Sequence, residues 1–257
     1  MTIRPLRAVS AALSATPALS LSAAALAATL VLTGCVAGEG SAAGSDGSSA
    51  DAGGWSDDTL SIDFATYNPL SLVIKDQGWL EETLGDDVEV TWVQSAGSNK
   101  ANEALRAGVV DVGSTAGSAA LLARSNGSPI SSVDVYSQPE WSAIVVAADS
   151  PATSVADLAG SSVAATKGTD PYFFLLQALD EAGLSIDDVE VQNLQHADGK
   201  AALESGAVDG WAGLDPLMAT SEIEAGSRLL YRNVDFNSYG LLNATESFLT
   251  ESPDLAQ

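Results

Sequence analysis

This chain of 257 residues has one cysteine, one histidine and ten lysine or arginine residues, against 34 aspartate or glutamate residues. So few basic residues exclude a nucleic-acid-binding surface, which needs clustered positive charge. One cysteine excludes an internal disulfide, and with a single histidine it leaves too few ligands for a typical zinc site. Neither a G-x-x-x-x-G-K-[ST] phosphate loop nor a G-x-G-x-x-G fingerprint occurs. We therefore expect no metal, no cofactor and no enzymatic activity.

Weaker catalytic candidates add little to this picture. His196 lies beside an expected loop, where we expect it to be solvated. A Ser/Lys pair or paired carboxylates remain open as catalytic groups, but no spacing singles out either of them.

The first 35 residues are typical of a secretory signal. Arg4 and Arg7 form a short basic start, and residues 8–36 carry no charge. The stretch ends in Leu32-Thr33-Gly34-Cys35, which resembles the bacterial lipobox, whose cysteine is lipidated and becomes the mature N-terminus. An uncleaved transmembrane anchor is the alternative, since the uncharged stretch is long enough to span a bilayer. Both interpretations place the rest of the chain outside the cytoplasm, held at the membrane.

A tract rich in Gly, Ser, Ala and Asp follows at residues 36–58. It has no apolar periodicity, so we expect a flexible linker and a folded part that begins near Thr59. Beyond Cys35 the chain carries eight basic and 34 acidic side chains, a net charge of −26. Such a chain has no attraction to an anionic membrane surface, so a lipid on Cys35 would be its only tether.

One sequence segment occurs in two similar copies, about a hundred residues apart. Residues 104–111 (ALRAGVVD) recur as 202–209 (ALESGAVD), and the VEV of 88–90 recurs at 189–191. Matches in the same order at a nearly constant offset favour two α/β units of one design. Similar composition of unrelated units is the alternative. Two similar lobes that face each other form a cleft, where small ligands bind.

Strand-like segments alternate with helix-like segments from Leu60 onward, which predicts an α/β fold with parallel sheets. In such sheets ligands bind beyond the carboxyl ends of the strands. This rule selects the loops at 67–68, 94–95, 113–115, 167–170 and 211–215.

Three small-residue loops, at 95–98, 113–118 and 167–170, could surround an oxyanion with hydroxyl groups and the backbone N–H groups of helix N-termini. Ordinary helix capping is the alternative for each loop. Trp141 and Trp211 are candidates for cleft walls, although a tryptophan in such a fold is more often part of the core.

Two acids are candidates for receiving a ligand ammonium or hydroxyl group. Asp215 is equally well explained as a helix N-cap before Pro216, and Glu140 as a solvated acid.

Four segments together resemble the aliphatic sulfonate-binding proteins of bacterial ABC importers, a group with taurine- and nitrate-binding relatives. They are ATYNPL (65–70), GSTAG (113–117), ATKGTDPY (165–172) and WAGLDP (211–216). The resemblance implies a type II periplasmic-binding fold with two Rossmann-like lobes, a two-strand hinge and a ligand in the interlobe cleft. Lobe one would comprise 59–144 plus 237–257, and lobe two 145–236.

The resemblance also implies a ligand-binding set. Serine and threonine hydroxyls would hold the sulfonate oxygens, aromatic groups would shape the pocket for the alkyl part, and an acid would face any polar tail. The expected residues are Tyr67, Asn68, Ser95, Ser114, Thr115, Trp141, Thr169, Asp170, Trp211 and Asp215.

The expected function is that of a monomeric, lipid-anchored, extracytoplasmic binding protein that delivers sulfonates to a membrane permease driven by an ATPase. Taurine, nitrate or a thiamine-related pyrimidine remain open as ligands, and a structural or adhesive surface lipoprotein remains open as another class. Relatives are usually longer at the C-terminus. Ser252-Pro253-Asp254 has the pattern of a helix start, which favours a truncated lobe one over a frayed terminal turn.

Overall fold

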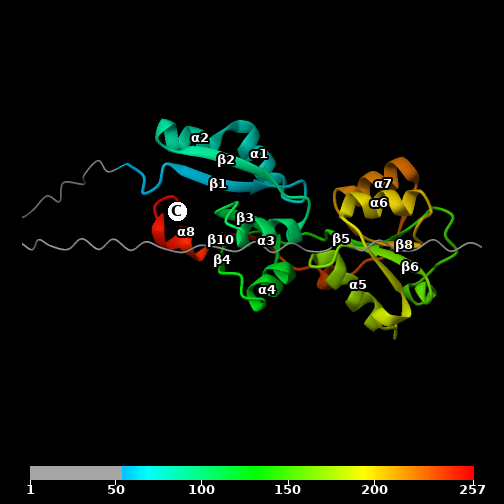
Figure 1. Cartoon of the computed structure of the whole chain (residues 1–257). Coiled ribbons are helices and arrows are strands. Elements are labelled where there is room, and N and C mark those ends of the chain that lie inside the picture. Colours follow the sequence, from blue (N-terminus) through cyan, green and yellow to red (C-terminus); the bar gives the residue numbers. More distant parts are fainter. Residues whose placement is uncertain (1–53) are drawn as a thin grey trace, which may run out of the picture. The chain divides into compact units, whose positions relative to one another are not determined.

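The computed structural model describes residues Gly54–Gln257, which form two five-stranded sheets flanked by helices (Figure 1). The expected signal sequence, Cys35 and most of the expected linker lie outside the described residues. In Gly54–Gln257, no helix combines the length and the apolar character that crossing a membrane requires.

The sheet of lobe one has the strand order β2-β1-β3-β10-β4. β1 runs parallel to β2 and β3, whereas β10 runs antiparallel to β3 and β4. Its strands are β1 (Thr59–Phe64), β2 (Glu89–Gln94), β3 (Val112–Ala116), β4 (Ile130–Ser137) and β10 (Gly240–Thr245). Its helices are α1 (Pro69–Gln77), α2 (Trp79–Leu84), α3 (Ser98–Arg106), α4 (Gly117–Ser125) and α8 (Glu246–Glu251), with a 3-10 turn at Gly85–Asp87.

The sheet of lobe two has the order β7-β6-β8-β5-β9. β6 runs parallel to β7 and β8, whereas β5 runs antiparallel to β8 and β9. Its strands are β5 (Ser142–Val146), β6 (Ser162–Ala165), β7 (Glu190–Asn193), β8 (Gly210–Leu214) and β9 (Arg228–Tyr231). Its helices are α5 (Asp170–Glu181), α6 (His196–Glu204) and α7 (Leu217–Ala225), with 3-10 turns at Val155–Leu158, Ile186–Asp188 and Val234–Phe236.

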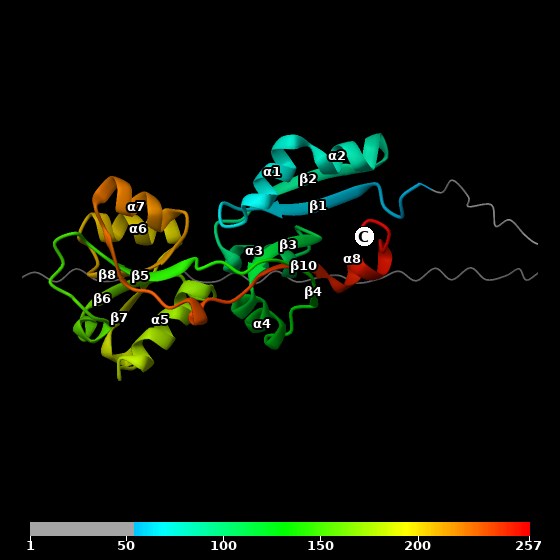
Figure 2. The same cartoon turned by 180° about the vertical axis from the view of Figure 1, so that it is seen from behind.

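The two sheets follow one plan, in which the fourth strand of each comes from across the hinge. β5 follows β4 in the chain but lies in the second sheet, and β10 follows β9 but lies in the first. The chain therefore crosses between the lobes twice, before β5 and again before β10 (Figure 2). Asn237 Oδ1 accepts a hydrogen bond from Ser142 N at 2.8 Å, which ties the two crossings together.

The first crossing lies a few residues earlier than expected. The boundary placed after residue 144 falls inside β5, all of which pairs with β8 in the second sheet. The run SAIVV identified a buried strand, but an apolar run carries no information about which of two similar sheets it joins.

The repeated segment occupies equivalent positions in the two lobes. Residues 104–111 link α3 to β3, and residues 202–209 link α6 to β8. Asp111 Oδ2 accepts a hydrogen bond from Ser61 N at 2.8 Å, and Asp209 Oδ2 accepts one from Ser162 N at 2.8 Å. The same contact in both lobes supports a single α/β design used twice.

The last residues of the expected linker are held against lobe one. Trp55 Nε1 donates to Leu84 O at 3.2 Å, and Ser56 N donates to Asp254 Oδ2 at 2.8 Å. Contacts with lobe one thus include residues that precede Thr59.

The expected helix start at Ser252 forms one turn, in which Ala256 N donates to Ser252 O at 3.2 Å. α8 begins earlier, at an N-cap formed by Thr245, whose Oγ1 accepts from Phe248 N at 3.2 Å. Ser252 follows the end of α8, and its backbone N–H donates to Phe248 O. Ser252 therefore both ends α8 and begins the turn that follows it.

Candidate functional site

A small cavity lies between the lobes, at the carboxyl ends of parallel strands in both sheets, where the fold favours ligand binding. Its volume is about 10 Å³, which is roughly the space needed for one water molecule. A ligand larger than a water molecule therefore requires this cavity to widen. The lining residues are Tyr67, Ser98, Ala116, Trp141, Thr169, Asp170, Pro171, His196 and Leu214.

Asp170 is the most highly connected side chain of this cavity. It is the first residue of α5, followed by Pro171, and its side chain is only 3 % exposed. Its carboxylate accepts hydrogen bonds from Trp141 Nε1 at 2.7 Å, from Ser238 N at 2.9 Å and from Ser238 Oγ at 2.8 Å. The Ser118 hydroxyl on α4 of lobe one also donates to it. Asp170 therefore joins lobe two to α4 and to both crossing segments.

Three other predicted residues line the cavity. Trp141, from the first crossing, is buried with its ring beside Asp170. Tyr67 is buried in lobe one and donates from its hydroxyl to Ser114 O at 2.9 Å. Burial raises the pKa of Tyr67 well above its ordinary value, so this hydroxyl keeps its proton. Thr169 donates to Thr166 O at 2.6 Å, so its hydroxyl proton is already used within lobe two.

The serines expected to hold sulfonate oxygens instead surround a carboxylate, Asp63 of β1. Ser114 N and Ser114 Oγ donate to Asp63 Oδ1 at 2.8 and 3.0 Å. Burial raises the pKa of Asp63 from 3.8 to about 6, while hydrogen bonds from Ser114 and Ser95 partly offset the rise. Asp63 Oδ2 has no hydrogen-bond partner among the described residues. Ser95 and Ser114 do not line the cavity, and Asp63 is a buried acid that the sequence pattern missed.

Thr115 and Asn68 have structural contacts outside the cavity. Successive strand residues point to opposite faces of a sheet, so Ser114 and Thr115 cannot hold the same ligand group. Thr115 Oγ1 accepts from Asn243 Nδ2 of β10 at 2.7 Å. Asn68 is the N-cap of α1 before Pro69, as its sequence position indicated, and its side chain accepts from Ser71 N.

Trp211 belongs to the core of lobe two and not to the cleft wall. It is 1 % exposed in β8, and it packs in one cluster with Leu203 of α6 and Met218 of α7. Every residue of β8 is buried, because helices cover both faces of this central strand. Trp211 lies at the start of a loop that was predicted to bind the ligand, but this position alone did not predict where its ring points.

The two acids proposed to receive a polar ligand group, Asp215 and Glu140, also have structural partners. Asp215 Oδ1 accepts from Ala219 N at 3.2 Å near the start of α7, although the N-cap of this helix is Pro216 and not Asp215 as the capping alternative had it. Glu140 forms an ion pair with Arg232, with Arg232 Nη2 2.7 Å from Glu140 Oε2. Neither residue lines the cavity.

His196 is the functional candidate that the sequence interpretation missed. It was expected to be solvated, but it is 2 % exposed at the start of α6 and lines the cavity. Its Nδ1 lies 3.2 Å from Thr166 Oγ1, and its Nε2 has no hydrogen-bond partner among the described residues. Burial lowers the pKa of His196 to about 4, so the ring is neutral at pH 7. A signal existed, because His196 follows the carboxyl end of β7, but that loop was not selected.

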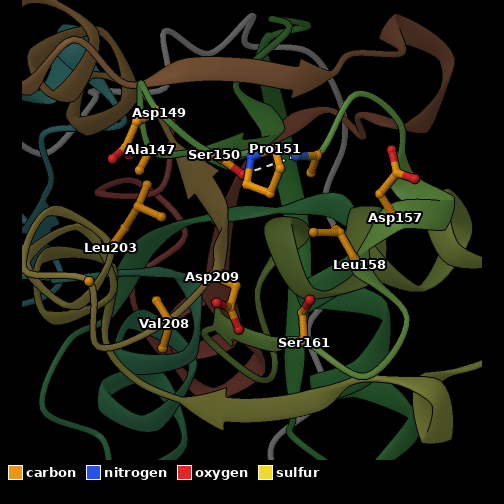
Figure 3. A pocket seen from close by; sticks show the side chains of 12 residues that line it. Ala147, Asp149, Ser150, Pro151, Asp157, Leu158, Ser161, Leu203, Val208 and Asp209 are labelled. Carbon is orange, nitrogen blue, oxygen red and sulfur yellow. Dashed lines mark hydrogen bonds between the residues drawn. The ribbon is translucent and has the colours of Figure 1, made fainter.

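A larger cavity, of about 540 Å³, lies at the opposite edge of the second sheet, where β6 and β8 begin. Figure 3 shows the carboxylates of Asp149, Asp157 and Asp209 around it. Asp157 already accepts a hydrogen bond from the backbone N–H of Ser154, and Asp209 accepts one from the backbone N–H of Ser162. No group of three possible metal-binding side chains occurs in residues Gly54–Gln257. The interlobe cavity is therefore the better candidate.

Comparison with known proteins gives consistent likenesses. Residues 70–257 match the family described as NMT1/THI5 like. A curated relative from Escherichia coli (strain K12), named as an aliphatic sulfonates-binding protein, is 34 % identical over 172 residues, or 66 % of this chain. The chain spans only 54 % of that relative's length.

Solved structures are similar as well. The alkanesulfonate-binding protein SsuA from Xanthomonas axonopodis pv. citri, bound to MOPS, gives a TM-score of 0.73 at 26 % identity and covers 78 % of this chain and 70 % of its own. The periplasmic aliphatic sulphonate binding protein SsuA from Escherichia coli gives a TM-score of 0.65 at 30 % identity. This match covers 76 % of this chain and 67 % of the SsuA chain. These likenesses confirm the predicted two-lobed periplasmic-binding fold. With a family match over residues 70–257, the chain belongs to the NMT1/THI5-like family.

Proposed function

We propose that this protein is the extracytoplasmic solute-binding component of an ABC importer, and that it binds aliphatic sulfonates as a monomer and delivers them to a membrane permease with its ATPase. The observation that carries the proposal is a cavity lined by both α/β lobes in a chain similar to proteins named for sulfonate binding. We propose binding without catalysis, because those relatives are named as binding proteins.

In the proposed complex, neutral donors hold the sulfonate group. Ser98 Oγ accepts a hydrogen bond from Ala116 N at 2.9 Å, so its own proton is free for a ligand oxygen. α5 and α6 begin at the cavity residues Asp170 and His196. The backbone N–H groups at these two helix N-termini would add hydrogen-bond donors and a favourable helix potential for an anion. Tyr67, Trp141 and Leu214 would contact the alkyl part. Hydrogen bonds to an ionised oxygen are about twice as strong as neutral ones, so no arginine is required.

Thermal unfolding with a panel of alkanesulfonates tests the proposal. A ligand at a hundredfold excess over its Kd should stabilise the folded protein by about 2.7 kcal/mol, and the melting temperature should rise accordingly. The alcohol with the same carbon chain lacks the anion and should leave the melting temperature unchanged. If no sulfonate shifts the unfolding curve, the proposed function is wrong.

We also propose that a lipid on Cys35 holds the protein at the outer face of the membrane. The proposal is supported by the Leu32-Thr33-Gly34-Cys35 junction and by the strongly acidic chain that follows it. Replacing Cys35 with alanine should move the protein from the membrane fraction to the soluble fraction of fractionated cells. A Cys35→Ala variant that remains in the membrane fraction would contradict the lipid anchor.

A further inference from the structure

His196 lies where the two lobes meet. It begins α6 of lobe two, and its Nε2 faces Gly97 of lobe one, where an added Cβ would lie 3.0 Å from that nitrogen. The Nε2 atom is buried, it has no partner in the described part of the chain, and the ring lines the interlobe cavity. A buried polar atom without a partner is unusual in a folded protein, and a ligand group is one way to satisfy it.

The hydrogen bonds around Thr166 determine which ring nitrogen carries the proton. Thr166 Oγ1 lies 2.6 Å from Leu194 O, a carbonyl that can only accept, so the threonine proton is donated there. His196 Nδ1 lies 3.2 Å from the same hydroxyl oxygen and must therefore be the donor in that contact. In the neutral ring, Nε2 is then a bare acceptor. Because burial holds the pKa of His196 near 4, the ring stays neutral at pH 7.

The other polar side chains of the cavity are also mainly acceptors. Tyr67 donates its proton to Ser114 O, Thr169 donates to Thr166 O, and Trp141 donates to Asp170. Asp170 and Tyr67 are the other titratable side chains that line the cavity, and no lysine or arginine does so. The free side-chain donor is the hydroxyl of Ser98. Such a lining favours a ligand that brings its own donor in addition to its anionic group.

We propose that His196 selects, among sulfonates, those whose carbon chain carries an amino or hydroxyl group, by accepting a hydrogen bond from that group at Nε2. The proposal rests on the proposed function and names the ligand class within it. A simple alkanesulfonate would leave Nε2 buried without a donor, which is unfavourable. An amino group would in addition face the carboxylate of Asp170 across the same cavity.

Calorimetric titration with three matched ligands tests this selectivity. The ligands are ethanesulfonate, 2-hydroxyethanesulfonate and 2-aminoethanesulfonate, which differ in one terminal group. The wild-type protein should bind the two donor-bearing ligands about tenfold more tightly than ethanesulfonate, the effect of one net hydrogen bond. In His196→Phe the preference should disappear, so that the three ligands bind with similar affinities. In His196→Gln, whose amide oxygen is an acceptor, part of the preference should remain.

Equal affinity of the wild-type protein for the three ligands would overturn the selectivity and leave the proposed function intact. A preference that survives in His196→Phe would show that another group selects the ligand, which overturns the role of His196 and leaves the proposed function intact. If none of the three binds, the proposed function fails together with this inference.

A spectroscopic measurement does not depend on the folding of any variant. The chain has a single histidine, so its imidazole ¹⁵N signals are unambiguous. At pH 7 the free protein should show a protonated Nδ1 and a bare Nε2, and the Nε2 signal should shift when 2-hydroxyethanesulfonate binds. A proton on Nε2 in the free protein would exclude the proposed acceptor.

Discussion

Replacing Asp170 with alanine is expected to lower the free energy of unfolding by about 3–5 kcal/mol, because it leaves several buried donors without an acceptor, at about 1–3 kcal/mol each. Trp141 Nε1 and the backbone N–H and hydroxyl of Ser238 would lose their partner, and each buried donor left unpaired is costly. For a chain of this size, each kcal/mol corresponds to a shift of roughly 2–4 °C in melting temperature. A loss of about 10 °C should therefore be visible by calorimetry.

Ser118→Ala provides the matched control for Asp170→Ala. Ser118 on α4 contributes a hydrogen bond to Asp170 from lobe one, whereas Trp141 and Ser238 lie in the crossing segments. Its removal should cost only about 1 kcal/mol of stability, but it should weaken ligand binding, because it affects the closed arrangement of the lobes. An Asp170→Ala protein with the wild-type melting temperature would show that the cluster does not hold the hinge.

Replacing Asp63 with asparagine is expected to stabilise the protein at pH 7, which is unusual for a buried, hydrogen-bonded acid. Burial raises the pKa of Asp63 from 3.8 to about 6 in the folded state. Between about pH 4 and pH 6 the folded protein retains a proton that the unfolded chain releases. Stability therefore falls as the pH rises through this window and stays lower above it. A shift of about two pKa units corresponds to about 3 kcal/mol.

The asparagine side chain keeps an oxygen for Ser114 N and Ser114 Oγ but carries no charge to bury. Urea unfolding at several pH values between 4 and 7.5 should show the decline in the wild-type protein and a flatter profile in Asp63→Asn. Ser114→Ala removes a hydrogen bond that lowers the pKa of Asp63, so the decline in that variant should extend to higher pH. Parallel profiles for the wild type and Asp63→Asn would mean that Asp63 is not the responsible group.

Much of the architecture could be predicted from local patterns. The alternation of strands and helices identified an α/β fold, and the repeat at 104–111 and 202–209 pointed to two lobes of one design, each with the same aspartate–serine contact. The Asn68-Pro69 pair marked the start of α1. These features depend on hydrogen bonds and apolar periods within a short stretch of chain, so they can be read from the sequence.

The candidate site was predicted only in part. Tyr67, Trp141, Thr169 and Asp170 do line the interlobe cavity, because the carboxyl ends of strands lie there in any sheet of this type. Ser95 and Ser114 had the right position but the wrong partner, since the acid opposite them comes from β1, far away in sequence. Trp211 lies in the core and not at the cleft wall, and His196 is buried at the cavity and not solvated.

Composition and local pattern were enough to predict the fold class, the doubled design and the acidic character of this chain. Tertiary contacts, in contrast, set which hydroxyls are free for a ligand, which tryptophan faces the cleft and which histidine nitrogen carries a proton. The reason is that a donor or acceptor can be used only once, and the groups that compete for it meet only when the two lobes have folded and closed.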